Sequence, residues 1–171
     1  MARILKHKRG TTAQHAAYTG PVGEVTVDTD KDTVVVQDGV TAGGHALAKE
    51  ASVTQCIAVA CSDETTALTT GLAKVTFRMP YAFTLSAVRA SLSTAQTSGS
   101  VLTVDINEGV SSILSTKLTI DNTEKTSTTA TTPVVISDTA LADDTEITID
   151  IDQVGDGTAK GLKVYLIGKK G

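Results

Sequence analysis

From residue 55 onward, the sequence is a succession of short apolar runs separated by turn-forming residues, which favours an all-β fold. Residues 74–79 alternate polar and apolar side chains at the period of a half-buried strand. Residues 82–89 resume the alternation, and we expect Phe83, Leu85 and Ala87 on one side of that strand. Further strands are expected at 101–107, 113–120, 134–136, 146–152 and 162–167. Their spacing predicts a β-sandwich or jelly-roll module.

The first 50 residues are expected to form a separate small unit with one short helix. Thr11 and Gln14 have the spacing of a capping box, in which each side chain accepts a hydrogen bond from a free N–H group at the start of a helix. The Gly-Pro pair at positions 20 and 21 should end that helix. Strand-like runs follow at 24–28 and 33–37. The sequence therefore predicts two domains, 1–50 and 55–171.

Aromatic residues are rare, at 3% of the chain, and tryptophan is absent. Because each large ring buries about 150–250 Å², the core must be built from Val, Ile, Leu and Ala instead. A unit of about 50 residues hides too little surface to be stable alone unless disulfides, metals or oligomerisation help. Since the sequence supports neither of the first two, we predict a closed homo-oligomer.

Several classes of function are disfavoured by the sequence. The net charge of −4 and the pI near 5.3 argue against a broad nucleic-acid footprint. No window of about 18 apolar residues predicts a membrane span, and no secretory signal follows the N-terminal charges. No serine-nucleophile or phosphate-loop motif occurs, and no cofactor is expected. His7, His15 and His45 lack zinc-ligand spacing and are interpreted as surface or interface residues.

Carboxylates are concentrated near residue 150, where the isoleucines of 146–152 should take one face of a strand and the acids the other. Asp150, Asp152 and Asp156 form a candidate calcium site, and a carboxylate pair for glycoside cleavage is a second reading. The favoured interpretation is a solvated face that discourages edge pairing, with no metal bound and no catalysis.

Cys56 and Cys61 lie on one apolar run, five residues apart. In a regular strand this spacing places them on opposite faces, so they cannot pair with each other. We expect both to be buried free thiols that act as small hydrophobic side chains. A disulfide across a bulge or between subunits is the alternative.

Three motifs occur in order in the N-terminal unit: Lys-Arg-Gly-Thr-Thr-Ala-Gln-His at 8–15, Gly-Glu-Val at 23–25 and Val-Gln-Asp-Gly-Val-Thr-Ala-Gly-Gly at 36–44. With them, roughly the first 50 residues resemble the N-terminal module of phage tail-fibre proteins, which also heads the phage major tropism determinant. The resemblance implies a β-prism-like module about a threefold axis, in a virion appendage. The remainder is similar in texture to β-sandwich modules of phage fibre and decoration proteins.

We interpret the basic run as a strand whose charges meet an acidic surface on a subunit or neighbouring virion protein. The expected interaction residues are Arg3, Lys6, Lys8, Arg9, Thr11, Gln14 and Tyr18.

The leading hypothesis is a non-enzymatic homotrimeric surface appendage of the virion, of a short tail- or neck-fibre type, assembled in the host cytoplasm. Its partners would be capsid, neck or tail proteins, and its loops 93–100 and 121–132 would face outward. A capsid-decorating cement or head-fibre protein is the first alternative. A carbohydrate-binding module that reads host glycan, with Tyr81 as the candidate stacking ring, is the second. A depolymerase is the least favoured reading.

Overall fold

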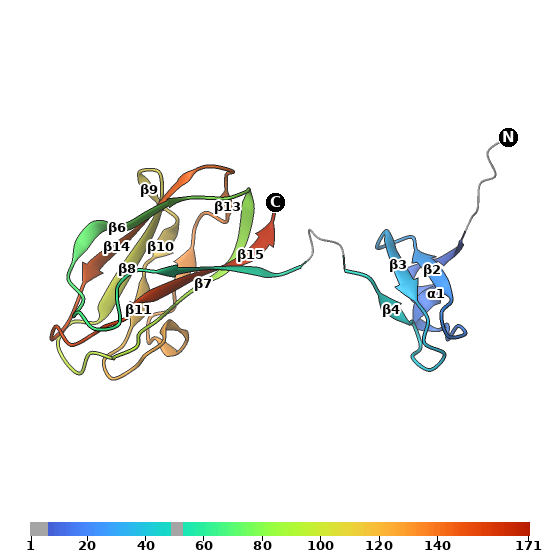
Figure 1. Cartoon of the computed structure of the whole chain (residues 1–171), viewed down its shortest axis with the longest axis horizontal. Coiled ribbons are helices and arrows are strands. Elements are labelled where there is room, and N and C mark those ends of the chain that lie inside the picture. The colour runs from blue at the N-terminus through green and yellow to red at the C-terminus, as the bar shows by residue number, and fades with distance from the viewer. Residues whose placement is uncertain (1–6, 49–52) are drawn as a thin grey trace. The chain divides into compact units, whose positions relative to one another are not determined.

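The computed structural model describes residues 7–48 and 53–171 and divides the chain into two compact units, Met1–Val53 and Thr54–Gly171 (Figure 1). Strands dominate the described residues of both units, whose one α-helix is short, and this confirms the predicted all-β class. No helix among the described residues is long and apolar enough to cross a membrane.

The N-terminal unit is a four-stranded sheet with one helix. Its elements are β1 (Lys8–Gly10), α1 (Thr12–Ala16), β2 (Val25–Asp28), β3 (Thr33–Val36) and β4 (His45–Ala46). The strands lie in chain order; β1 runs parallel to β2, and the other pairs are antiparallel. Both predicted strands are confirmed to within one residue at each end. The capping box is confirmed too: Gln14 N donates to Thr11 Oγ1 at 3.2 Å, and Thr11 N donates to Gln14 Oε1 at 2.9 Å.

His15 holds the helix on the sheet. Its side chain is 6% exposed, and its two ring nitrogens lie 3.0 Å from Thr11 O and from Thr26 Oγ1. Beside it, Thr12 Oγ1 donates to the buried carboxylate of Asp28. The interpretation of His15 as a surface residue was wrong, because the apolar content of this unit is so small that polar groups complete its interior.

The second unit consists of two main sheets that enclose the core. The first has the order β11 (Leu118–Ile120), β8 (Leu102–Glu108), β14 (Glu146–Gln153) and β6 (Gly71–Arg78), with β9 (Ser111–Ser112) on β8. The second has the order β13 (Ala140–Leu141), β7 (Phe83–Ser91), β15 (Lys163–Lys170) and β5 (Gln55–Ala60). A short pair, β10 (Leu114–Thr116) with β12 (Val135–Ile136), and a 3₁₀ turn (Ser127–Thr129) complete the unit.

The core is aliphatic, as the scarcity of aromatic residues predicts. Alternate residues of the central strands are fully buried between the sheets: Leu102, Val104 and Ile106 of β8, Ile147, Ile149 and Ile151 of β14, and Val164 and Leu166 of β15. Phe83 is the largest buried side chain.

The prediction of which residues of β7 face the core was only partly correct. Phe83 and Leu85 point into the core as expected, but Ala87 is only partly buried, and Val88 is the next buried residue. The register between β7 and β15 shifts at this point, because Leu85 pairs with Gly168 and Ala87 with Ile167. Such a bulge inserts one residue and reverses the alternation after it. The period-two pattern of the sequence cannot reveal it.

Only one of the two cysteines is buried, so the expectation was wrong for Cys56. Cys56 is exposed on the edge strand β5, whereas Cys61 is 7% exposed, and both are free thiols. Burial raises the pKa of the Cys61 thiol to about 11. We expect iodoacetamide near neutral pH to alkylate Cys56 within minutes and Cys61 only after unfolding, since the thiolate is the reactive form. Mass spectrometry of tryptic peptides measures this, and equal rates in the folded chain would contradict the assignment.

Candidate interaction surface

The sheet of the N-terminal unit has two faces of different character. Residues paired across β2 and β3 share a face, so Thr26 and Val35 lie together on the side of the helix. There Thr26 contacts His15, and the glycine-rich turn at Gly43 and Gly44 lines the same side.

The opposite face carries four valines: Val25 pairs with Val36, and Val27 pairs with Val34. We call these four residues the valine face. Val25 is 38% exposed and the other three are partly buried, although the helix and the glycine-rich turn lie on the other side. Leu47, 57% exposed, follows the strand that borders this face. This face is apolar surface on a small unit, which makes it a candidate contact surface for a partner.

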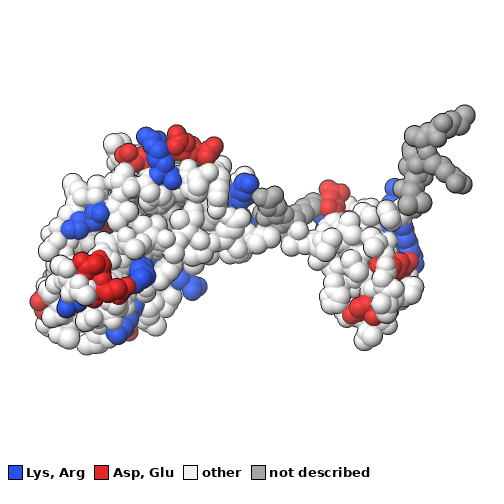
Figure 2. Space-filling view, viewed as in Figure 1, with Lys and Arg blue, Asp and Glu red and all other residues white. Residues whose placement is uncertain are grey.

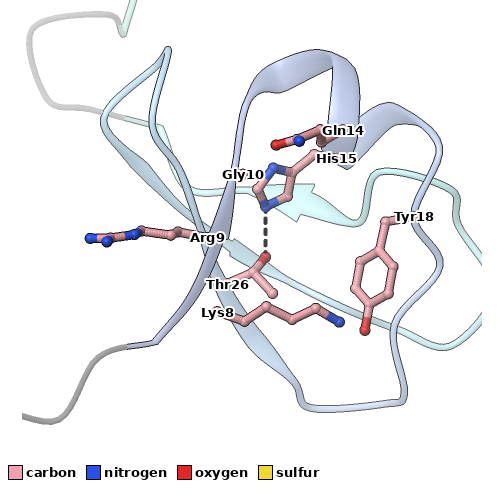
Figure 3. A pocket seen from close by; sticks show the side chains of 7 residues that line it. All are labelled: Lys8, Arg9, Gly10, Gln14, His15, Tyr18 and Thr26. Atoms are coloured by element: carbon pink, nitrogen blue, oxygen red, sulfur yellow. Dashed lines mark hydrogen bonds between the residues drawn. The ribbon is translucent and has the colours of Figure 1, made fainter.

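Two basic residues of β1 point to opposite faces of the sheet. Arg9 pairs with Val27 and is exposed beside the valine face, whereas Lys8 pairs with Thr26 on the helix side. Figure 3 shows the side chain of Arg9 pointing away from those of Lys8, His15 and Tyr18. Lys8 and Arg9 therefore do not contribute to the same face of the sheet.

Lys8 lines a hollow of about 270 Å³ on the helix side, together with Gly10, Gln14, His15, Tyr18 and Thr26 (Figure 3). Lys8 Nζ lies 3.6 Å from the centre of the Tyr18 ring and 3.6 Å from Glu24 Oε1, and the Tyr18 hydroxyl donates to Glu24. The hydrogen bond to Tyr18, followed by the charge of Glu24, raises the pKa of Lys8. Lys8, Tyr18 and Glu24 together hold in place the segment that follows the helix α1.

The remaining predicted interaction residues have local roles or fall outside the description. Thr11 and Gln14 are engaged in the capping box. Arg3 and Lys6 lie outside the described residues. The valine face was not among the predicted residues, although the alternation of Val25 with Val27 and of Val34 with Val36 would have indicated it.

The loop between β3 and β4 is held by Asp38. This carboxylate accepts hydrogen bonds from the hydroxyl and the N–H of Thr41 and from the N–H of Val40, and it lies 3.0 Å from His45 Nε2. These donors, those of Thr41 first, hold the pKa of Asp38 well below its usual range. The Asp-Gly-Val-Thr motif at 38–41 thus forms a turn in which the ionised carboxylate of Asp38 accepts hydrogen bonds from the residues that follow it.

The three calcium candidates do not form one site. Asp150 is buried and accepts from Ala73 N at 2.6 Å and from Asn107 Nδ2 at 3.0 Å. Asp152 pairs with Lys117 at 2.6 Å, and Asp156 binds the 97–98 loop. Among residues 7–48 and 53–171, no group of three His, Cys, Asp or Glu side chains could hold a metal ion. The expected solvated face was wrong for Asp150, because the backbone of the β6 edge covers it.

Lys117 bridges the carboxylates of Asp105 and Asp152. We expect its ammonium group to occupy the position that a metal ion would need. Its ammonium lies 3.0 Å from the buried Asp105 and 2.6 Å from Asp152, and hydrogen bonds to Asp152 and Asp105 raise its pKa to about 12. We therefore expect neither calcium nor EDTA to shift the melting temperature of the full chain. Differential scanning fluorimetry tests this, and a calcium-dependent rise would contradict the arrangement.

Tyr81 is not positioned as a sugar-stacking platform. Its ring lies 6.2 Å from that of Phe83, packed partly against the core, and its hydroxyl donates to Gln55 Oε1 at 2.7 Å. The carbohydrate-binding hypothesis loses its best aromatic candidate.

Comparison with known proteins gives matches of unequal extent. The family model "Major tropism determinant N-terminal domain" matches residues 5–41. The "Tail fiber receptor-binding protein" of Bordetella phage BPP-1 is 59% identical over 49 residues, which is 29% of this chain and only 13% of that protein. Solved structures of the P3c and I1 variants of the major tropism determinant, 26% and 29% identical, match 80% of this chain and 35% of theirs, each with a TM-score of 0.29. The chain thus spans a small part of these relatives, and its match to the major tropism determinant N-terminal domain covers residues 5–41.

Proposed function

We propose that the chain is a non-enzymatic structural protein of a phage virion that serves in attachment to the host. The observation that carries this is the 59% identity, over 49 residues, to a protein described as a tail-fibre receptor-binding protein. The range that the family model covers, residues 5–41, contains groups that fold the unit: the capping-box pair, and Asp38 with its turn. A module that keeps its fold is expected to keep its way of assembling.

We further propose that the protein is a homotrimer joined through its N-terminal units. The valine face supports this, because it leaves apolar surface on a unit whose interior already depends on polar groups. Three copies of the face around one axis would remove that surface from water. This would stabilise the trimer by about 25 cal/mol for each Å² of apolar surface buried. Closed cyclic symmetry also prevents the face from making filaments.

The location on the particle is tested by copy number. Quantitative mass spectrometry of purified virions should find the chain at a few to a few tens of copies, the number for a tail or neck appendage. Hundreds of copies would instead assign it to capsid decoration. Absence from purified virions would contradict the proposed function altogether.

A further inference from the structure

Strand β7 has a gap in the pairing of one of its two edges. One edge pairs with β15 along the length of the strand, whereas β13 on the other edge is only two residues long. Beyond β13, Leu85 N donates to Thr139 O at 2.7 Å, and Ala90 N donates to the Ser127 hydroxyl at 2.8 Å. Between these two contacts, residues 86–89 have no neighbouring strand on this edge among the described residues.

The backbone of Val88 points into this gap. Along a strand, the N–H and C=O groups of alternate residues point to the same edge. Ala90 N and Leu92 N both donate away from β15, to Ser127 Oγ and Lys125 O. Val88 lies two residues before Ala90 with no register shift between them, so its N–H and C=O face the gap too. Val88 is 3% exposed, and neither group has a backbone partner on that edge among the described residues. The gap thus presents one donor and one acceptor that an added strand would satisfy.

Apolar side chains surround the gap. A hollow of about 390 Å³ lies between residues 86–88 of β7 and residues 134–136. A second hollow, of about 270 Å³, continues it to the 3₁₀ turn, since Val88 and Val134 line both. Val135, 49% exposed, also lines the first hollow. We call the two hollows together the β7 groove: a short apolar groove beside an open strand edge.

The β7 groove carries a single charge. Of the residues that line it, Arg89 is the one that is ionised. Arg89 is exposed and lies opposite Tyr165 on the outer face of the sheet, and no carboxylate within residues 7–48 and 53–171 pairs with it. Because Val88 and Arg89 are successive strand residues, their side chains point to opposite faces. A strand laid along the gap would therefore meet the apolar core side on one face and a cation on the other. This arrangement favours a strand with apolar residues on one face and a carboxylate on the other.

We propose that the β7 groove binds an extended segment of a partner protein, which adds to the sheet as an antiparallel strand and pairs a carboxylate with Arg89. The partner is a different protein rather than a second copy of this chain, because two β7 edges paired with each other would bring two Arg89 cations together. On the face of the sandwich drawn in Figure 2, charged side chains form small clusters with uncharged surface between them. Uncharged surface is thus common on this unit, and the open backbone edge is what distinguishes the groove. The inference does not depend on the attachment function, since the sandwich alone forms the groove.

The test uses the purified full chain and two fluorescein-labelled peptides that differ in one residue. The first is Ser-Thr-Val-Asp-Val-Thr-Ser, in which the acid would lie opposite Arg89 and the two valines on the groove side. The second has Lys in place of Asp. Fluorescence anisotropy should show half-saturation of the first peptide below about 1 mM protein. The second should bind at least about tenfold more weakly.

Exchange of the protein charge tests whether Arg89 sets this preference. Arg89→Glu should bind the Lys peptide at least about tenfold more tightly than the Asp peptide. Lys169→Glu is the matched control, because it makes the same change of charge on an exposed residue of the same sheet but beside Thr84. This variant should keep the wild-type preference.

Each other outcome rejects a stated part of the proposal. No saturable binding of the Asp peptide, or the same preference in Arg89→Glu as in the wild type, would show that the groove does not take an acidic strand. A peptide methylated on both valine nitrogens cannot donate to Val88 O and should not bind, so equal binding would rule out strand pairing. A mass in light scattering that falls on Arg89→Glu substitution would assign the groove to a second copy of the chain.

Discussion

Val27→Asp should convert the protein from a trimer to a monomer whose N-terminal unit is unfolded and whose sandwich is intact. Val27 lies in the middle of the valine face, paired with Val34 and beside Arg9. In the proposed trimer the substitution would bury one carboxylate of each copy among apolar side chains, where Arg9 of its own β1 is the cation beside it. Burying charged groups in an apolar interface costs several kcal/mol even when they are paired, so we expect the association constant to fall by at least about 10³-fold.

The matched control places the same charge on the other side of the unit. Ala13 is exposed in the first turn of α1, where a carboxylate is favoured by the free N–H groups of the helix. Ala13→Asp should therefore keep the wild-type mass in light scattering and the wild-type amide protection of residues 25–36. Equal masses for the two variants would show that the valine face is not the interface.

Gln96→Ala should release the long loops of the sandwich while its two sheets stay folded. The truncation removes three hydrogen bonds to Ser100, Asn122 and Gly155 and opens a polar cavity in a fully buried position. Each buried group left unpaired costs about 1–3 kcal/mol, partly recovered by entering water. We expect a loss of about 2–4 kcal/mol in the free energy of unfolding.

A second glutamine provides the control for this variant. Gln153 is exposed at the end of β14, so Gln153→Ala should change the unfolding free energy by less than about 0.5 kcal/mol. Urea titration followed by circular dichroism measures both, and hydrogen exchange should show the loss of protection in residues 92–101 and 154–162. If Gln96→Ala unfolds no more easily than Gln153→Ala, Gln96 does not hold the loops.

Much of the fold was predictable because strands with one buried face reveal themselves by alternation. The isoleucines of β14 and the Thr11–Gln14 capping box are local patterns, and both are present as predicted. The bulge in β7 was not predictable, since it depends on how β7 pairs with β15. The two-residue strand β13 is too short to carry a pattern and was missed.

The candidate surfaces were harder to predict from the sequence than the strands, because they depend on how distant segments pack together. The resemblance identified the N-terminal unit, but Lys8 and Arg9, the two residues of the basic run that lie in β1, point to opposite faces of the sheet because they are successive strand residues. The link among the long loops depends on Gln96, an ordinary residue in the sequence whose three partners come from three separate segments. A buried acid such as Asp150 likewise depends on a distant backbone N–H group, that of Ala73.

The mass of the purified full chain in solution, from light scattering coupled to gel filtration, tests the account most directly. Trimerisation through the valine face predicts a single species of three times the 17.6 kDa chain mass, with protected amides in β2 and β3. A species of one chain mass at every concentration, with those same amides protected, would show that the unit is stable alone and would contradict the account.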